Sequence, residues 1–372
     1  MDLNTTPPST DNWTCIEYPG VEPFAVTLHM VQKIVCIFSL ISNILVIIIV
    51  LGDRKAHTTA NLLIVNLAVS QILLLVVRLH SLPLIASDIG MTSLSCKLWR
   101  GGMHWSQAAT ALTICTISLE RRRATKSLSR SSNIPQRQLA IGVAFIWVIT
   151  LAASLRMFIV SDITMRYRPS CDGEPVTTGF CYPDREPGYD IYTYLFQVFF
   201  YLIPLIVMSV AYGCVICSLR YTSNGTSLQP SQVKRMIATR RRVSVTVFVI
   251  SLAFCILWFP YVFLQLIWYV EEFSLGIGMI QILYFIIISE ILIEFQGCVN
   301  VLTLCFLSQS FRQSMLLYLR FVYNCVTKCR CGCRKSKADV YVRNEPKYTL
   351  QSNNDHRATR NTNVTCEQSS QL

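Results

Sequence analysis

The sequence predicts an all-α membrane protein, a bundle of seven transmembrane helices, and three observations support this fold class. Hydrophobic residues make up 52% of the 372 positions and charged residues only 15%, whereas soluble globular proteins carry about 25% charged residues. Seven apolar runs reach the length of about 20 residues that crosses a bilayer. Basic residues outnumber acidic ones by 33 to 21, which leaves a net charge of +12, and they gather in two of the loops between the runs. This charge fits a membrane protein with a basic inner surface, so nucleic acid is not an expected partner.

The predicted spans follow one another along the chain, each an apolar run between polar or turn-forming segments. They cover residues 26–51, 59–84, 97–121, 138–160, 192–219, 243–269 and 277–306. The sixth span carries no charge, and the first is nearly as apolar. The third is the weakest, because it is diluted by several threonines and by Gly101, Gly102, His104 and Gln107. We expect protein to surround the third span on most sides, since lipid would leave its polar groups unpaired.

The loops predict the orientation of the chain. The loops after the third and fifth spans contain several Lys and Arg and no acid, which places them in the cytoplasm by the positive-inside rule. Residues 1–25 contain four acidic residues and no basic one, so we expect them outside and the C-terminus inside. They have neither a basic n-region nor an apolar h-region, and the first span is expected to act as its own insertion signal.

Four regions follow from this topology: an extracellular segment 1–25, a transmembrane domain 26–308, a membrane-proximal segment 309–333 and a disordered cytoplasmic tail 334–372. The third of these begins with an amphipathic helix, since apolar residues recur at helical spacing in Phe311, Met315, Leu316 and Leu319. Cysteines that follow close to the membrane are candidates for palmitoylation. They are Cys325, Cys329, Cys331 and Cys333.

The outer side of the chain carries modification signals. Asn4 and Asn12 begin acceptor sequences for N-glycans. Four cysteines are expected outside, where disulfides persist, and four cysteines allow three pairings. They are Cys15, Cys96, Cys171 and Cys181.

The chain lacks the motifs of enzymatic chemistry. It contains no Walker or Rossmann glycine pattern and no His-Glu-x-x-His sequence, and none of its five histidines stands at ligand spacing from another. We therefore expect no enzyme, no cofactor and no metal site. A multipass transporter is an alternative of a different class, although its halves would usually resemble each other and these do not.

Specific residues in all seven spans resemble those of the rhodopsin-like (class A) G-protein-coupled receptors, most closely the peptide-receptor branch. Cys96 stands 25 residues before Arg121, the spacing of that family's outer cysteine and inner arginine in the third span. Other matching positions lie in the first, second and fourth to seventh spans. They are Asn43, Val46, Asn66, Trp147, Pro204, Tyr212, Phe254, Trp258, Pro260 and Asn300. The resemblance covers about residues 26–322.

The resemblance implies how such a protein would signal. Pro260 removes a backbone hydrogen bond and bends the sixth span, whose inner half would swing outward to admit a heterotrimeric G protein. Glu120 would pair with Arg121 until that movement frees the arginine. The switch residues that the resemblance implies are Glu120, Arg121, Tyr212, Phe254, Trp258, Pro260 and Asn300.

The chain departs from the family pattern in three motifs. Val301 replaces the proline of the seventh span, and Arg122 replaces the tyrosine after the inner arginine. Gln71 replaces the aspartate that holds a sodium ion, and Leu304 replaces the tyrosine that would face Tyr212. Arg240 stands where an acid often locks Arg121. The sodium-binding carboxylate and the acid that locks Arg121 both stabilise the inactive state, and both are missing, whereas Leu304 removes one contact of the active state. This balance predicts raised basal activity, and the missing carboxylate predicts no response to sodium.

The resemblance also suggests the class of ligand. Met103 occupies the position of the aspartate in amine receptors, so amines are not expected. Glu290 and Glu294 share a helical face and form an acidic flank suited to a basic or amidated peptide; alternatively, Glu290 pairs internally with Arg78 and touches no ligand. The candidate ligand contacts are Met103, Gln107, Arg78, Trp258, Gln265, Glu290 and Glu294. A lipid or a small chemosensory molecule is the second candidate ligand.

The remaining expectations also follow from the resemblance. It pairs Cys96 with Cys181, which leaves Cys15 to pair with Cys171. It places the protein in the plasma membrane, in contact with lipid, with a peptide ligand outside and a G protein inside. Arrestin and receptor kinases would bind the tail.

Overall fold

The computed structural model describes nine stretches of the chain together with residues 320 and 323. The stretches are 21–52, 57–86, 92–126, 134–168, 176–183, 189–222, 230–267, 279–307 and 311–318. Several of the expectations above lie outside these residues. They concern Asn4, Asn12, Cys15, Cys171, the four tail cysteines and the tail 334–372.

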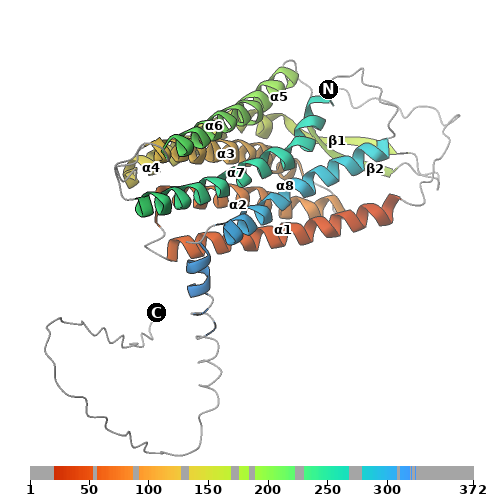
Figure 1. The fold of residues 1–372 in the computed structure, drawn as a ribbon. Coiled ribbons are helices and arrows are strands. Elements are labelled where there is room, and N and C mark those ends of the chain that lie inside the picture. Colours follow the sequence, from red (N-terminus) through yellow and green to blue (C-terminus); the bar gives the residue numbers. More distant parts are fainter. Residues whose placement is uncertain are drawn as a thin grey trace, which may run out of the picture. The chain divides into compact units, whose positions relative to one another are not determined.

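Each predicted span is helical in the structure, and the helices run side by side (Figure 1). The first four spans are α1 (Val21–Gly52), α2 (Thr59–Ala86), α3 (Ser93–Lys126) and α4 (Gln136–Val160). The fifth span comprises α5 (Tyr189–Gln197), a π-helical turn (Val198–Leu202) and α6 (Ile203–Thr222). The last two are α7 (Pro230–Ile267) and α8 (Met279–Leu307). The predicted all-α bundle is confirmed.

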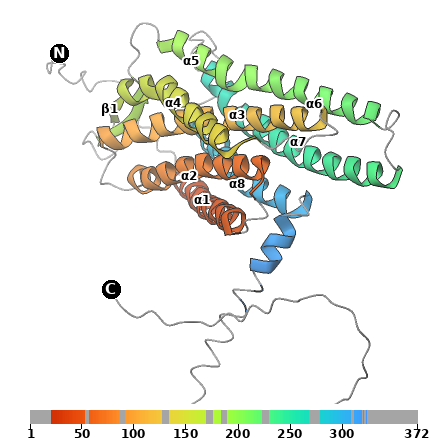
Figure 2. The ribbon, with the colours of Figure 1, turned by 90° about the vertical axis from the view of Figure 1, so that its left-hand side faces the viewer.

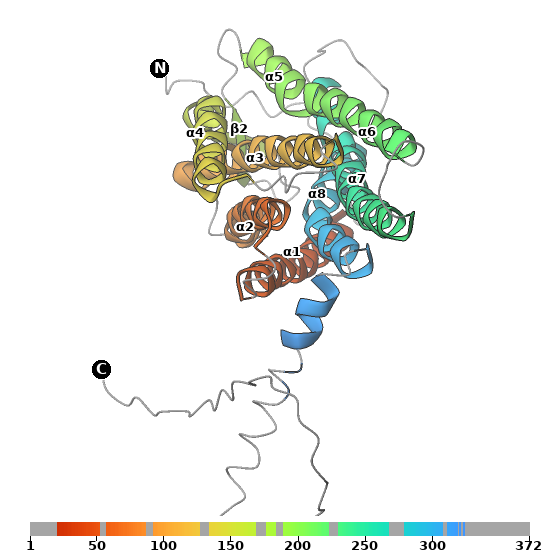
Figure 3. The same cartoon turned by 60° about the vertical axis from the view of Figure 1, so that its left-hand side comes forward.

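The third span is surrounded by protein, as its polar composition predicts. α3 packs against α2, α4, α6 and α7 and lies between them when the bundle is viewed obliquely (Figure 3). Residues 108–111 of α3 are 0% exposed. Within the described residues, six helical segments are long and apolar enough to cross a bilayer, and α3 is not among them. It is held in place by its neighbours rather than by its own affinity for lipid.

On the other side of the bundle, α1 packs against both α2 and α8 (Figure 2). A glycine permits the contact with α8: a Cβ atom on Gly297 would overlap the Ser39 hydroxyl and come within 2.5 Å of the Asn43 side-chain nitrogen. The absence of a side chain at this position therefore sets how closely the two helices approach.

Two features differ from the sequence expectations because hydropathy does not report them. α7 begins at Pro230, well before the predicted start at residue 243, since a helix can continue through polar residues beyond the lipid; proline is favourable at a first helical position. The π-helical turn in the fifth span ends two residues before Pro204. Pro204 has no backbone N–H and crowds the carbonyl four residues earlier, which favours a local widening of the helix.

A β-hairpin lies at one end of the bundle (Figure 1). Its strands, β1 (Ser161–Arg168) and β2 (Val176–Pro183), pair antiparallel, with Ile163 opposite Cys181. Cys181 forms a disulfide with Cys96 near the start of α3, as the resemblance implies. The bond ties the hairpin to the central helix.

A further helical segment, residues 311–318, follows α8 and is amphipathic. Phe311 and Ser314 are buried, whereas Arg312 and Leu316 are exposed. The Cys305 thiol lies 3.7 Å from the Met315 sulfur and links the segment to α8. The short helix expected after the seventh span is present.

Candidate functional site

The bundle contains a buried cluster of charged side chains that joins three helices. Arg78 of α2 is only 1% exposed and forms ion pairs with both Glu290 and Glu294 of α8. Its Nε atom donates to Glu294 Oε1 over 2.9 Å. Gln32 of α1 donates to the same oxygen over 2.9 Å. The Arg78 guanidinium also lies over the Trp99 ring, 4.9 Å from its centroid.

The cluster combines two expectations for Glu290. The two glutamates lie together on one helical face, as their four-residue spacing predicts, and Glu290 pairs internally with Arg78, which was the alternative to ligand contact. One guanidinium faces two carboxylates, so the group carries a net negative charge when both acids are ionised. Removing one partner from a buried pair leaves an uncompensated charge, which makes the cluster sensitive to any group that competes for either acid.

Next to this cluster along α8, Gln296 links Trp258 into a chain of neutral side chains. Its indole N–H donates to Gln296 Oε1 of α8 over 2.7 Å. Gln71 Nε2 of α2 lies 3.4 Å from the same oxygen and 3.2 Å from the Thr110 hydroxyl of α3. All four side chains are 0% exposed. A neutral amide bridge thus occupies the place where the resemblance expects a carboxylate.

Gln296 was missed by the sequence analysis. It lies one turn before Asn300 on α8, and its polar side chain within an apolar span was a signal that it faces the bundle interior. The Trp258 ring also packs against Phe254, with ring centroids 5.9 Å apart, and Tyr201 donates to the backbone carbonyl of Cys255 over 2.7 Å. Trp258 is therefore a buried contact between α7 and α8.

The other candidate ligand residues lie on α3 and α7. Gln107 of α3 is fully buried and donates to Gln197 of α5 over 2.8 Å. Met103 is buried in the same hydrophobic cluster as Trp258, and Gln265 is half-buried near the end of α7. Apart from Met103 and Gln265, the candidates therefore fall into three groups: the charged cluster, the amide chain around Gln296 and the contact between α3 and α5.

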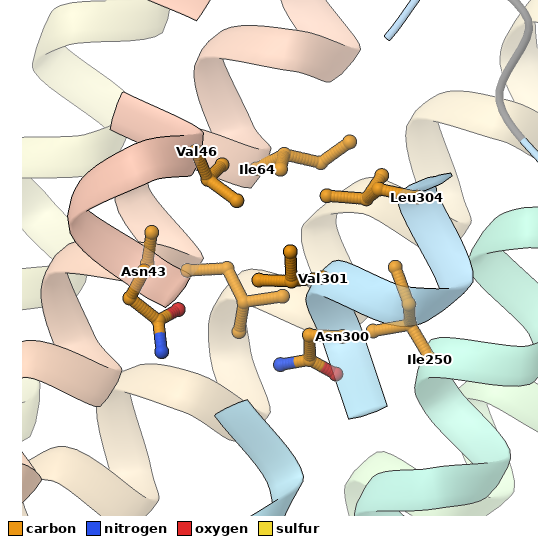
Figure 4. A pocket seen from close by; sticks show the side chains of 9 residues that line it. Asn43, Val46, Ile64, Ile250, Asn300, Val301 and Leu304 are labelled. Carbon is orange, nitrogen blue, oxygen red and sulfur yellow. The ribbon is translucent and has the colours of Figure 1, made fainter. Parts of the chain in front are cut away.

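Figure 4 shows a cavity of about 10 Å³ between α1, α2, α7 and α8, large enough for about one water molecule. The side chains of Asn43 and Asn300 lie on one side of it, and Ile64 and Leu304 on the other. Asn43 donates to the Ser39 carbonyl over 2.8 Å. Within the described residues, neither polar atom of the Asn300 amide has a hydrogen-bond partner. Leu304 fills the place of the family's tyrosine with an apolar wall.

Near the C-terminal end of α3, Glu120 forms an ion pair with the adjacent Arg121, as the resemblance implies. The charge of Arg121 acts on Arg240 of α7, so the two helices carry like charges here. Tyr212 of α6 is buried, and its hydroxyl lies between the hydroxyls of Ser118 and Ser251.

Comparison with known proteins places these features in one family. The sequence profile described as 7 transmembrane receptor (rhodopsin family) matches residues 42–308. The chain is similar to the Allatostatin-A receptor of Bombyx mori, with 26% identity over 84% of this chain and 86% of the relative. It is also similar to the Galanin-like G-protein coupled receptor npr-9 of Caenorhabditis elegans, with 24% identity over 82% and 76%. Bombesin receptor subtype-3 of Ovis aries is 25% identical over 79% and 75%.

The profile covers well over half of the chain, and the structure supplies the seven helical spans, the bond from Cys96 to the hairpin, the Glu120–Arg121 pair and the buried Trp258 that the resemblance implies. The protein therefore belongs to the rhodopsin family of seven-transmembrane receptors.

Proposed function

We propose that the protein is a plasma-membrane receptor for an extracellular peptide and that it activates a heterotrimeric G protein when the inner part of α7 moves outward. The observation that carries this proposal is its similarity, over most of its length, to receptors for peptides. Coupling to a G protein is general in the family. Pro260 lies inside α7 and supplies the hinge, because proline interrupts the hydrogen bonding of a helix.

The charged cluster supports a ligand with a positive group. Arg78 faces both Glu290 and Glu294, which leaves one negative charge for a cation to neutralise. A basic side chain or terminus entering from the outer end of the bundle would compete with Arg78 for Glu290. Met103, Gln107, Trp258 and Gln265 are the further candidate contacts of the ligand.

The direct test applies a library of basic and amidated peptides to cells that express the receptor, with calcium and cAMP readouts. An active peptide should lose potency by on the order of 10- to 100-fold in Glu290→Gln, the worth of a hydrogen bond to a charged group. Asp162→Asn is the control, since Asp162 is an outer carboxylate that is not buried. Equal potency in both variants would exclude Glu290 as a contact, and activation by lipid extracts but by no peptide would overturn the peptide proposal.

We also propose the orientation that the loop charges predict, with residues 1–25 outside and the tail inside. An epitope placed before residue 26 should bind antibody on intact cells, and one placed in 334–372 only after permeabilisation. Glycans on Asn4 and Asn12, a Cys15–Cys171 bond and palmitate on the tail cysteines belong to the same proposal, as does binding of arrestin and receptor kinases by the tail. Mass spectrometry of the unreduced receptor tests the three modifications.

A further inference from the structure

Signalling by outward movement requires that α7 be held to α3 in the resting state, and α7 offers no acid that could pair with Arg121 of α3 for this purpose. α7 contains no acidic residue between Pro230 and Ile267. Arg121 pairs with Glu120 on its own helix. Arg240, on the α7 side, has the same sign as Arg121 and interacts with it unfavourably. The attraction between α3 and α7 must come from elsewhere.

Three hydroxyl groups join the helices at this level. Ser118 of α3 donates to the Tyr212 hydroxyl over 3.2 Å, and the Tyr212 hydroxyl lies 3.1 Å from the Ser251 hydroxyl of α7. The three side chains are 0%, 6% and 3% exposed, respectively. The Phe248 ring packs edge-on against the Tyr212 ring at 5.1 Å, which keeps the phenol directed inward.

The three hydroxyl protons can be placed so that each hydroxyl donates one hydrogen bond. If Ser118 donates to Tyr212, Tyr212 donates to Ser251, and Ser251 then donates to the Val247 carbonyl, 2.9 Å away. In this arrangement every hydroxyl gives one hydrogen bond, and Tyr212 and Ser251 each also accept one. The Ile114 carbonyl, 2.8 Å from the Ser118 hydroxyl, is a second acceptor within reach of the Ser118 proton. Hydrogen bonds aligned in this way polarise one another in a buried setting.

We propose that Ser118 and Ser251 are the positioning residues that hold the resting receptor closed, through Tyr212. They form an uncharged bridge in place of an ionic lock. Ser118 lies three residues before Arg121, so the bridge is one helical turn from the arginine that the G protein would meet. When α7 swings outward, the bond between Tyr212 and Ser251 breaks. This inference rests on the proposed function in one respect, the movement of α7.

The bridge predicts that removing one hydroxyl favours the open state. Ser251→Ala should raise basal nucleotide exchange on G proteins, measured with purified receptor in lipid nanodiscs, by on the order of 2- to 10-fold, the worth of one neutral hydrogen bond. Ser251→Thr keeps the hydroxyl and should behave as the native chain. Ser209→Ala is the matched control, because the Ser209 hydroxyl donates only to Leu205 of its own helix, over 2.8 Å, and is exposed.

A second readout separates the bridge from G-protein coupling. An environment-sensitive unnatural amino acid at position 241, which is exposed near the start of α7, reports movement of that helix without any G protein. A fluorescence change in Ser251→Ala but not in Ser209→Ala supports the bridge. If fluorescence changes and exchange does not, the bridge stands and the coupling proposal fails. No fluorescence change, or equal changes in both variants, overturns the bridge.

Discussion

Single neutral side chains form the hydrogen bonds that link several helices in the interior of this receptor. The oxygen of Gln296 accepts the Trp258 indole at 2.7 Å, and Gln71 approaches the same oxygen at 3.4 Å. An amide can donate and accept at once, whereas a carboxylate only accepts. The pair therefore links α2, α7 and α8 without requiring a counter-ion.

The first prediction concerns sodium. Gln71 brings no negative charge to the interior, so basal exchange of the native chain should be unchanged across a sodium series at constant ionic strength. Gln71→Asp places a carboxylate beside Thr110 and Gln296, and sodium should then lower basal exchange. Potassium, which is larger, serves as the control cation. A native receptor that responds to sodium but not to potassium would contradict the argument.

A second prediction tests Gln296 directly. Gln296→Leu leaves the buried Trp258 N–H without its acceptor, which costs about 1–3 kcal/mol. The variant should unfold at a lower temperature in detergent than the native chain, while Gln296→Glu, which keeps an acceptor oxygen, should bind the indole and lose less. If the leucine variant is as stable as the native chain, the hydrogen bond contributes nothing.

Some residues of the site could be predicted from the sequence, some were implied by the resemblance, and others are apparent only in the structure. Glu290, Glu294 and Arg78 could be predicted, because charges inside an apolar span are rare and face protein. Trp258 and Tyr212 came from the resemblance. Ser118 and Ser251 could not be found, because a serine in a helix most often bonds the carbonyl one turn earlier, and that carbonyl lies within hydrogen-bond distance of each hydroxyl here, at 2.8 Å and 2.9 Å. Only the packing of α3, α6 and α7 brings them to Tyr212.

At the scale of the helices, the spans were predictable and their local departures were not. Apolar length located each span within a few residues, with α7 the exception because its polar first turns are invisible to hydropathy. The π-helical turn lies beside Pro204, whose ring crowds the preceding turn, and the hairpin is tied to α3 by the bond from Cys96 to Cys181. A window of composition registers neither feature.

The third prediction concerns the contact between α1 and α8. Gly297→Ala forces a methyl group into Ser39 and Asn43, and overpacking of this kind costs about 1–3 kcal/mol. Gly142→Ala and Gly213→Ala are matched controls in helices, since an added Cβ at either position meets nothing within 4 Å. Thermal unfolding should show a loss for Gly297→Ala and no loss for the controls. Equal unfolding temperatures would mean that the Ser39 and Asn43 side chains make room for the methyl group, and that the glycine does not set the contact between α1 and α8.

Across the whole molecule, the charged cluster joins α1, α2 and α8 into one unit. Gln32, Arg78 and Glu294 meet at a single carboxylate oxygen, and all are at most 2% exposed. α3 contacts this unit through the Trp99 ring, over which the Arg78 guanidinium lies, and α7 is joined to it by the neutral hydrogen bond of Trp258 with Gln296.

The fourth prediction follows from the balance of charge in this unit. Arg78→Gln leaves Glu290 and Glu294 without their cation, and breaking a buried pair costs about 3–5 kcal/mol. We expect little receptor at the cell surface, measured by antibody binding to an N-terminal epitope. Adding Glu290→Gln removes one of the two buried charges left without a cation and should restore part of the expression. Normal surface levels of the single variant would show that the pair is not needed for folding.

The close approach at Gly297 and the ion pairs of Arg78 have a mechanical consequence. α1, α2 and α8 form a stiff half of the bundle, joined by buried ion pairs, whereas the hydroxyl bridge through Tyr212 that links α6 and α7 to α3 is uncharged, and these two helices form a compliant half. A ligand can change the conformation of the receptor only through contacts with helices that are able to move. A molecule that touches the stiff half alone would therefore occupy the receptor without turning it on, and it would act as a blocker, while an agonist must also reach the helices that can move.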